Sequence, residues 1–566
     1  MRINKIKFSL IIVLIVMFVG LEGSICFFYG TLSSKSEIFN FDKMYKDIYK
    51  PFFKKIQRNN EYLYVSKNPL LNYQEFSVVK KKSVIRIFIL GGSVAELYGK
   101  DLSLRLGFKC LAPDISFEII NCGIGGYDSY RVLLVEKEIL NYDPDLIIIF
   151  SGNNEYYASA KFSPIAYSLN KILSKLWSYR KLQGQVSRLL SYVGIEQFRN
   201  RERRLIDYRK NIIRIVKKAK NKKIPIILNT LPFNMRDCPP SGMSYPLNKE
   251  IIRSMYLLDK KDYHSAVEVL TKYLEYNSES SLGFFYLGKA YDRINDYKRA
   301  KENYLKGFHL RDSLWERATS ESNKIIRNIG NRENITIVDL EQVFINKSSN
   351  GLMGRELLRD NCHWWEDCNL IVSYSILEAM FKNKDSYRQI FGNSLYEFNL
   401  PIPKTLTMQE RGKNKKEIRM LREHCVWSLL VSDFYEISVL YSMETLFYLN
   451  PKVLWDIQYS KENIYEEFMK DRTMREYIIE NGIDKKWPLI ICSVGETYRR
   501  LGLFKEALSY FNHSIELDKY NYLPYVGKAL LFSALGDKHN ALINFEHAES
   551  LSDNEEIKSY KALVGF

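Results

Sequence analysis

A serine and a histidine of this chain stand in contexts that suit chemistry. Ser93 follows Gly91 and Gly92 directly after an apolar run, and His363 follows Asp360 by three residues. A serine hydroxyl becomes nucleophilic when a neighbouring imidazole takes its proton, and a carboxylate on the far ring nitrogen supports that imidazole. These residue types suit acyl transfer, although a Gly-Gly-Ser turn by itself is more often a plain turn or a helix cap.

Five largely apolar runs of strand length could position these residues. Near-continuous apolarity is typical of strands buried on both faces of a parallel sheet, and segments between the runs, such as residues 129–140, have helical spacing. The alternation predicts a three-layer α/β domain. The five runs are Val84–Leu90, Phe117–Ile120, Leu146–Phe150, Ile224–Leu228 and Ile335–Val338.

The first three runs end in small or polar residues. Ser93 follows the first run, Gly126 closes a glycine-rich loop after the second, and Asn154 follows the third. Open α/β sheets place their sites at the carboxyl ends of the strands, so we expect these residues to converge. The glycines before Ser93 allow a tight turn, and a helix starting there would offer N–H groups to an oxyanion.

This ordered set of a serine, a glycine, an asparagine and a D-x-x-H motif resembles the SGNH (GDSL-like) hydrolase family. The resemblance covers roughly residues 84–240 and 330–385. It implies a flavodoxin-like three-layer α/β fold around a parallel sheet. It also implies a serine esterase that uses neither a metal nor an organic cofactor.

The resemblance further implies a role for each site residue. Ser93 would be the nucleophile, His363 the general base and acid, and Asp360 the residue that orients His363. The backbone N–H of Gly126 and the side chain of Asn154 would form the oxyanion hole with the N–H of Ser93. Two simpler alternatives stay open, because Asn154 could only cap its loop and His363 could be an ordinary core histidine.

The chain departs from the family pattern at three places. Gly92 stands where the commonest form has aspartate, which weakens the match but removes no member of the triad. Glu155 replaces a usual aspartate, and we expect this to affect loop packing more than chemistry. The bulky Trp364 and Trp365 follow the histidine where small residues are common, so we expect an altered mouth of the site.

The segment after the fourth run, residues 229–240, is expected to border the site. Asn234 and Arg236 in this segment are candidates for substrate contact. A purely structural role in the loop is an equal alternative for both.

Two regions of the chain repeat themselves at a spacing of 34 residues. Ala266 recurs as Ala300 in the first region, and Ala507 recurs as Ala541 in the second. The pattern resembles the tetratricopeptide repeat (TPR), a helix–turn–helix unit whose small residues allow close helix packing. The resemblance implies all-α segments that bind a protein partner, one inserted in the hydrolase domain and one C-terminal to it.

The N-terminal region predicts a membrane anchor. Arg2, Lys5 and Lys7 precede an uncharged run, residues 8–21, which approaches the length of about 20 needed for a span if Glu22 lies at the far interface. A cleaved signal peptide is the alternative, but no A-x-A-like site follows. With positive charge on the N-terminal side, the rest of the chain should lie outside the cytoplasm.

These features divide the chain into seven segments. We expect a membrane anchor or signal segment (1–30), a membrane-proximal connector (31–82), the first part of the hydrolase domain (83–245), a TPR-like insertion (246–322), the last part of the hydrolase domain with the D-x-x-H motif (323–390), a linker (391–420) and a C-terminal helical domain with TPR repeats (421–566).

Composition limits the other possibilities. Lysine and arginine exceed aspartate and glutamate by 17, but they are scattered and no nucleic-acid motif accompanies them. A basic surface that faces anionic lipid or glycan is therefore favoured over nucleic-acid binding. The eight cysteines include no C-x-x-C pair, so no metal site is indicated, while one or two disulfides stay open.

Together these patterns predict a membrane-anchored, single-pass, extracytoplasmic serine ester hydrolase whose substrate is an acyl ester of a lipid or glycan. Two alternatives remain. One is an O-acyltransferase or deacetylase that acts on an extracytoplasmic glycan with the same residues. The other is a catalytically inactive TPR scaffold, which loss of the site geometry would favour.

Overall fold

The computed structural model describes most of the chain beyond the N-terminal 50 residues. The described residues are 51–68, 70–99, 103–155, 195–240, 249–310, 317–391, 398, 400–414, 418–419, 421–422, 437–450, 483–553 and 555–564. The chain divides into two compact units, and one of them, Phe52–Tyr157 with Tyr208–Phe566, holds nearly all of these residues. The predicted anchor (1–30) lies outside the described residues. Within the described ranges, no helix combines the length and apolarity that crossing a membrane requires.

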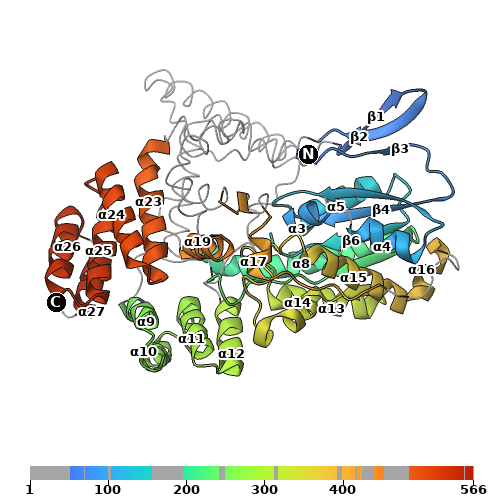
Figure 1. Ribbon diagram of the computed structural model, residues 1–566. Helices are drawn as coiled ribbons and strands as arrows, with labels where there is room; N and C mark the ends of the chain where they lie inside the picture. Colours follow the sequence, from blue (N-terminus) through green and yellow to red (C-terminus); the bar gives the residue numbers. More distant parts are fainter. Residues whose placement is uncertain are drawn as a thin grey trace, which may run out of the picture. The chain divides into compact units, whose positions relative to one another are not determined.

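A five-stranded parallel sheet forms the centre of the larger unit (Figure 1). Its strand order is β5-β4-β6-β7-β8, which in chain order is 2-1-3-4-5, the flavodoxin-like arrangement. Each strand overlaps one of the five apolar runs, so the predicted parallel sheet is confirmed. The strands are β4 (Val84–Gly91), β5 (Ser116–Gly123), β6 (Leu146–Phe150), β7 (Ile226–Asn229) and β8 (Thr336–Val338).

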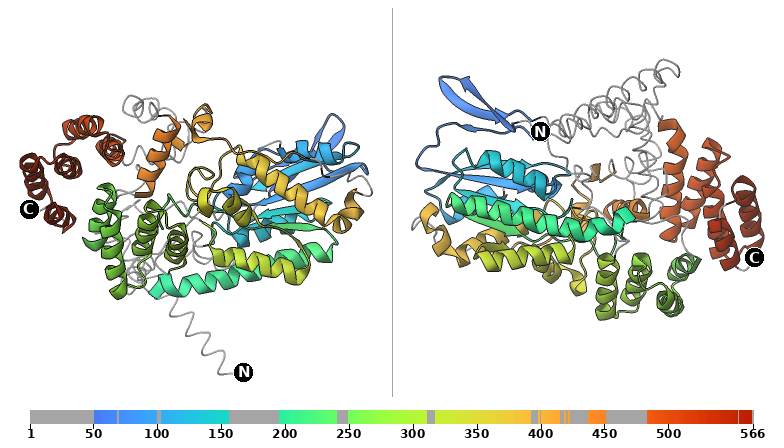
Figure 2. Two further views of the ribbon diagram at one scale, coloured as in Figure 1. Left: turned by 60° about the horizontal axis from the view of Figure 1, so that its bottom comes forward. Right: turned by 180° about the vertical axis from the view of Figure 1, so that it is seen from behind.

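Helices cover both faces of the sheet, as the burial of its strands requires (Figures 1 and 2). On one face α4 packs on α15, where Ser103 Oγ lies 2.7 Å from Ser373 Oγ. On the other face α8 packs on α5, where the Asn211 amide donates to Ser129 Oγ at 3.0 Å. The helices of this domain are α3 (Ser93–Tyr98), α4 (Ser103–Leu111), α5 (Ser129–Ile139), α8 (Ile195–Asn221), α13 (Ser320–Glu333), α14 (Leu340–Lys347), α15 (Cys368–Lys382) and α16 (Lys384–Phe391).

A small antiparallel sheet precedes the α/β domain, within the segment predicted to be a connector. Its strands are β1 (Phe53–Arg58), β2 (Glu61–Ser66) and β3 (Glu75–Ser77). The rings of Phe53, Tyr64 and Phe76 surround Tyr142 with centroids 4.4 to 5.6 Å apart. The fully buried Arg86 of β4 donates to the Ser77 carbonyl at 2.7 Å. The described part of the connector is therefore packed against the α/β domain.

The TPR-like insertion between β7 and β8 consists of α9 (Lys249–Asp259), α10 (Tyr263–Tyr276), α11 (Ser281–Arg293) and α12 (Tyr297–His309). The C-terminal helices are α23 (Ile483–Arg500), α24 (Phe504–Leu517), α25 (Leu523–Ala534), α26 (Lys538–Leu551) and α27 (Glu555–Leu563). The repeated residues Ala266, Ala300, Ala507 and Ala541 are fully buried. At Gly288 a β-carbon would lie 2.8 Å from the ring of Tyr304, so close helix packing explains the small residues of the repeat.

The described part of the predicted linker is docked on the α/β domain. Residues 400–407 have no regular secondary structure and lead to the short helix α17 (Met408–Arg411). The fully buried Arg411 makes two hydrogen bonds to Asp367, at 2.8 and 2.9 Å, and a third to the Glu356 carbonyl. Helix α19 (Ile437–Leu449) follows.

The cysteines give no evidence for the disulfides left open by the sequence. Those in the described ranges are all free thiols. They are Cys110, Cys122, Cys238, Cys362, Cys368 and Cys492.

Candidate active site

Ser93 is the first residue of helix α3, directly beyond the carboxyl end of β4. Gly92 is the N-cap residue, and its carbonyl accepts a hydrogen bond from the Glu96 N–H at 3.0 Å. At Gly91 a β-carbon would lie 2.1 Å from the Phe150 carbonyl oxygen of the neighbouring strand β6. The tight packing of two parallel strands therefore requires glycine there, and the chain turns at this point to present Ser93.

The structure brings Ser93, His363 and Asp360 into one hydrogen-bonded line. His363 Nε2 lies 2.7 Å from Ser93 Oγ, although the two residues are 270 positions apart. His363 Nδ1 lies 2.8 Å from Asp360 Oδ2 and 3.1 Å from Oδ1. This is the geometry in which an imidazole can take the hydroxyl proton while a carboxylate holds its other nitrogen.

The Asp360 carboxylate is fixed by the backbone of its own motif. Its Oδ1 accepts the N–H of Cys362 at 2.9 Å and that of His363 at 2.7 Å. The D-x-x-H motif thus forms a turn that places the Asp360 carboxylate next to the His363 imidazole. Because hydrogen bonds within the motif fix this turn, the spacing of Asp360 and His363 can be recognised in the sequence.

The pKa of His363 is set by two opposing effects. Burial lowers the pKa of the imidazole, but the Asp360 carboxylate and, to a smaller extent, Cys362 raise it well above its ordinary value of 6.5. Burial is the largest single effect, but the charge and hydrogen bonds of Asp360, which lies 2.8 Å from Nδ1, outweigh it together with Cys362. A strengthened base next to a serine hydroxyl is the condition for nucleophilic activation.

The two predicted oxyanion donors lie on the loops that follow β5 and β6. The Asn154 amide donates to the Tyr127 carbonyl at 3.1 Å, and a β-carbon at Gly92 would lie only 2.4 Å from Asn154 Nδ2. The structure therefore brings Asn154 against the residue that precedes Ser93. Gly126 has φ of 75°, a left-handed conformation that favours glycine.

A residue that sequence reasoning missed holds the glycine loop in place. Glu96, three residues after Ser93 on α3, accepts the N–H of Gly125 at 3.0 Å and the side-chain amide of Asn72 at 2.9 Å. Helix α3 and the loop that carries Gly126 are thereby joined by one carboxylate. Its position on the first turn of a helix is no signal by itself, because acidic residues are common there.

The structure shows what the residues do at two of the places where the chain departs from the family pattern. The Glu155 carboxylate accepts the N–H and the hydroxyl of Ser129, both at 2.8 Å, so it caps α5 as the loop-packing interpretation predicts. The expectation for Trp364 and Trp365 was wrong. Both indoles point into the core, and their N–H groups donate at 2.7 Å to Asn369 and to the Arg355 carbonyl. The mouth of the site is not formed by these rings.

Asn234 and Arg236 are both engaged by the protein itself. Asn234 is buried and accepts the N–H of Asp237 at 2.9 Å, while its own N–H donates to the Asn361 carbonyl at 2.9 Å. Arg236 makes a bidentate pair with Asp292 of the TPR-like insertion, at 2.7 and 2.9 Å. These contacts favour the structural alternative for both residues.

One group of side chains in the described part of the chain could hold a metal ion. Ligand atoms of Asp360, Cys362 and His363 lie within 4.8 Å of one another. Because His363 Nδ1 already faces the Asp360 carboxylate, an ion there would replace the contact that orients the imidazole. The donor set therefore fits a catalytic triad better than a metal centre.

A family model described as the tetratricopeptide repeat matches residues 490–521, which include most of α23 and all of α24. This match confirms the prediction of TPR repeats in the C-terminal region. No curated protein sequence matches the chain.

Several solved structures are similar to the chain. A protein assigned as an acylhydrolase from Bacteroides fragilis and a GDSL-like lipase from Bacteroides thetaiotaomicron are each 13% identical, with a TM-score of 0.27. Both matches cover 54% of this chain, and they cover 89% and 93% of those chains. The Cut9–Hcn1 hetero-tetramer of the APC/C is 11% identical, with a TM-score of 0.16 over 64% of this chain and 53% of that chain. Likenesses of this size assign no activity, which has to be inferred from the side chains of the site.

Substitution of Gly92 tests the close approach of Asn154. Gly92→Ala is expected to lower the free energy of unfolding by about 1–3 kcal/mol, because the added methyl group would force the Asn154 amide to move. Gly125→Ala is the matched control, since a β-carbon there would meet its nearest atom, Glu96 Oε2, only at 3.4 Å. Chemical unfolding of both variants gives the comparison, and equal stability of the two would contradict the steric argument.

Proposed function

We propose that the chain is a serine ester hydrolase in which Ser93, His363 and Asp360 form the catalytic triad. The observation that carries the proposal is the 2.7 Å contact between His363 Nε2 and Ser93 Oγ, with Asp360 on the opposite ring nitrogen. An ordinary core histidine has no reason to meet a serine at a strand end in this way. An inactive scaffold would not require the hydrogen-bonded arrangement of Ser93, His363 and Asp360.

In the proposed first step, Ser93 Oγ attacks the carbonyl carbon of the ester while His363 Nε2 takes the hydroxyl proton. Asp360 stabilises the imidazolium that forms, through the 2.8 Å contact with Nδ1. The tetrahedral intermediate collapses when the alcohol oxygen leaves with the proton from His363. The product of this half-reaction is an ester between the acyl group and Ser93.

In the second step, water attacks the Ser93 ester with His363 again as the base, and the carboxylic acid leaves as Ser93 regains its proton. The oxyanion of both tetrahedral intermediates would be stabilised by the N–H groups of Ser93 and Gly126 and by the Asn154 side chain. Three elements support this assignment: α3 begins at Ser93, Gly126 adopts the left-handed conformation, and Asn154 lies against Gly92. Each such donor is typically worth about 3–4 kcal/mol in the transition state.

We propose in addition that the TPR helices bind a protein partner. The match of residues 490–521 to the repeat model supports this idea, because repeats of this kind stack into extended surfaces. The acyl substrate itself, a lipid or an acylated glycan, is proposed from the predicted location of the chain rather than from any side chain of the site.

Removal of the nucleophile is the first test. Ser93→Ala should lower ester turnover by about 10³-fold or more, and His363→Ala by nearly as much, because triad members act as a unit. Asn154→Ala should cost about 10²- to 10³-fold, since other oxyanion donors remain. Turnover is measured with short and long acyl esters on the purified protein.

The matched control for Ser93→Ala is Ser151→Ala. Ser151 is a buried serine directly after β6, and its hydroxyl has no hydrogen-bond partner among the residues that the structure describes. Its loss should leave turnover within about threefold of the parent, as expected when no contact is removed. A Ser93→Ala enzyme that keeps parental turnover would refute the covalent mechanism.

The pH profile tests the role of Asp360. His363 must be neutral to act as a base, and its pKa is raised, so kcat/KM should increase with pH through a pKa above 6.5. Asp360→Asn removes the carboxylate and leaves burial, which lowers the pKa. The acidic limb of the profile should therefore move to lower pH while kcat falls by about 10⁴-fold, as in triads that lose this residue. A limb that stays in place would show that Asp360 does not face the catalytic base.

We propose that residues 1–30 anchor the chain with its catalytic domain outside the cytoplasm. Three basic residues before a single apolar run support this orientation. Fusions of alkaline phosphatase and of a fluorescent protein that folds only in the cytoplasm, each joined after residue 40, should give phosphatase activity alone. Fluorescence without phosphatase activity would reverse the proposed orientation.

A further inference from the structure

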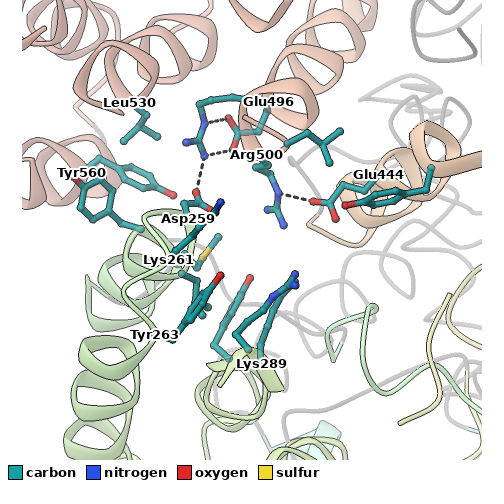
Figure 3. Close-up of a pocket in the computed structure, with 17 residues that line it drawn as sticks. Asp259, Lys261, Tyr263, Lys289, Glu444, Glu496, Arg500, Leu530 and Tyr560 are labelled. Carbon is teal, nitrogen blue, oxygen red and sulfur yellow. Dashed lines mark hydrogen bonds and ion pairs between the residues drawn. The ribbon is translucent and has the colours of Figure 1, made fainter. Parts of the chain in front are cut away.

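A cavity lies away from the triad, between helices of the TPR-like insertion and the C-terminal helices (Figure 3). Its volume is about 230 Å³, and α9, α11, α19 and α23 contribute most of its lining. None of Ser93, Asp360 and His363 lines it. Pockets for drug-sized ligands measure about 300–1,000 Å³, so this cavity suits a smaller molecule.

All three carboxylates of the lining are engaged by arginines of α23. Arg499 bonds Glu496 at 2.7 Å and Asp259 at 3.1 Å, and Arg500 bonds Glu444 at 2.8 Å. Figure 3 shows these ion pairs as the upper wall of the cavity. These pairs join α23 to α9 and α19, the helices that carry Asp259 and Glu444.

The lining as a whole is cationic, with five basic side chains against three acidic ones. Lys261 enters from the loop after α9, and Lys289 and Arg293 enter from α11, facing α23. Figure 3 shows Lys289 on the side of the cavity opposite Arg500. An excess of positive charge around an enclosed space attracts anions more strongly than the same charges on an open surface.

Glu444 shows how strong the positive field is. Burial would raise the pKa of this carboxyl, but Arg500, Arg355 and Lys289 hold it at about 2. The ionised Glu444 carboxylate thus interacts with Lys289 and Arg500 of the lining and with Arg355, which also pairs with Asp237.

We propose that this cavity binds a small polyanion, a molecule that carries phosphate or two or more carboxylates, through Lys261, Lys289 and Arg293. Charge-assisted hydrogen bonds from these groups would hold the anion. Tyr263 and Tyr448 also line the cavity and offer phenol hydroxyls as further donors. The site is independent of the esterase proposal, because no residue of the triad takes part.

Titration calorimetry on the full-length protein in detergent tests the proposal, with inorganic pyrophosphate as the phosphate probe and citrate as the carboxylate probe. We expect saturable binding of at least one probe at low ionic strength and weaker binding as salt is added. Lys289→Gln and Arg293→Gln should each weaken the affinity by about tenfold, the loss expected for one charge-assisted hydrogen bond. Thermal unfolding verifies that the variants are folded.

Lys272→Gln is the matched control, because Lys272 is exposed on the neighbouring helix α10 and does not line the cavity. Its affinity for the probe should equal that of the parent. Absence of binding of both probes would overturn the proposal, and so would binding that Lys289→Gln and Arg293→Gln leave unchanged. Capture of an acidic peptide by the parent protein, with neither small probe bound, would also reject a small-molecule site.

Discussion

The hydrogen bonds of the Asp360 carboxylate are the interaction on which the site depends. This one group accepts two backbone N–H groups of its own turn and faces the imidazole of His363. The segment around it has no regular secondary structure apart from one bridge, between Leu358 and Trp364. Its conformation therefore depends on side-chain contacts, and buried ion pairs are the strongest of these. Removal of one partner from such a pair costs about 3–5 kcal/mol.

Three arginines form these ion pairs, and each pair joins a different helical segment to the α/β domain. Arg411 ties Asp367 to the described part of the predicted linker, and Arg355 pairs with both Asp237 and Glu444 of α19. Arg236 joins the insertion through a bidentate bond with an aspartate of α11. The described linker and α19 are thus attached to the segment that carries His363, and the insertion is attached to the loop after β7. Glu444 pairs with Arg355 of this network and with Arg500 in the lining of the proposed anion cavity.

Much of the fold and of the site could be predicted from the sequence, because the patterns that indicate them lie within short segments. Parallel strands that are buried on both faces consist of continuous apolar runs, and the D-x-x-H motif forms its own turn. Both patterns involve neighbouring residues, so they can be recognised in the sequence. Arg86 and Arg411 could not be predicted in the same way. In the sequence they look like solvated charges, yet both are fully buried and have partners in segments distant in the chain. The small sheet before β4 was missed for a similar reason, since its strands are short and only cross-strand pairing and an aromatic cluster define them.

Gly92 shows how a departure from a family pattern can be a steric consequence of the site. In the sequence, glycine in place of aspartate weakens the resemblance and offers no explanation. In the structure, the Asn154 amide lies where a side chain at position 92 would begin, 2.4 Å from the β-carbon position. An aspartate could enter only if Asn154 or the Tyr127 carbonyl moved. The absence of a side chain at Gly92 therefore lets Asn154 lie close to the residue before Ser93, and Gly92 and Asn154 have to be considered as a pair.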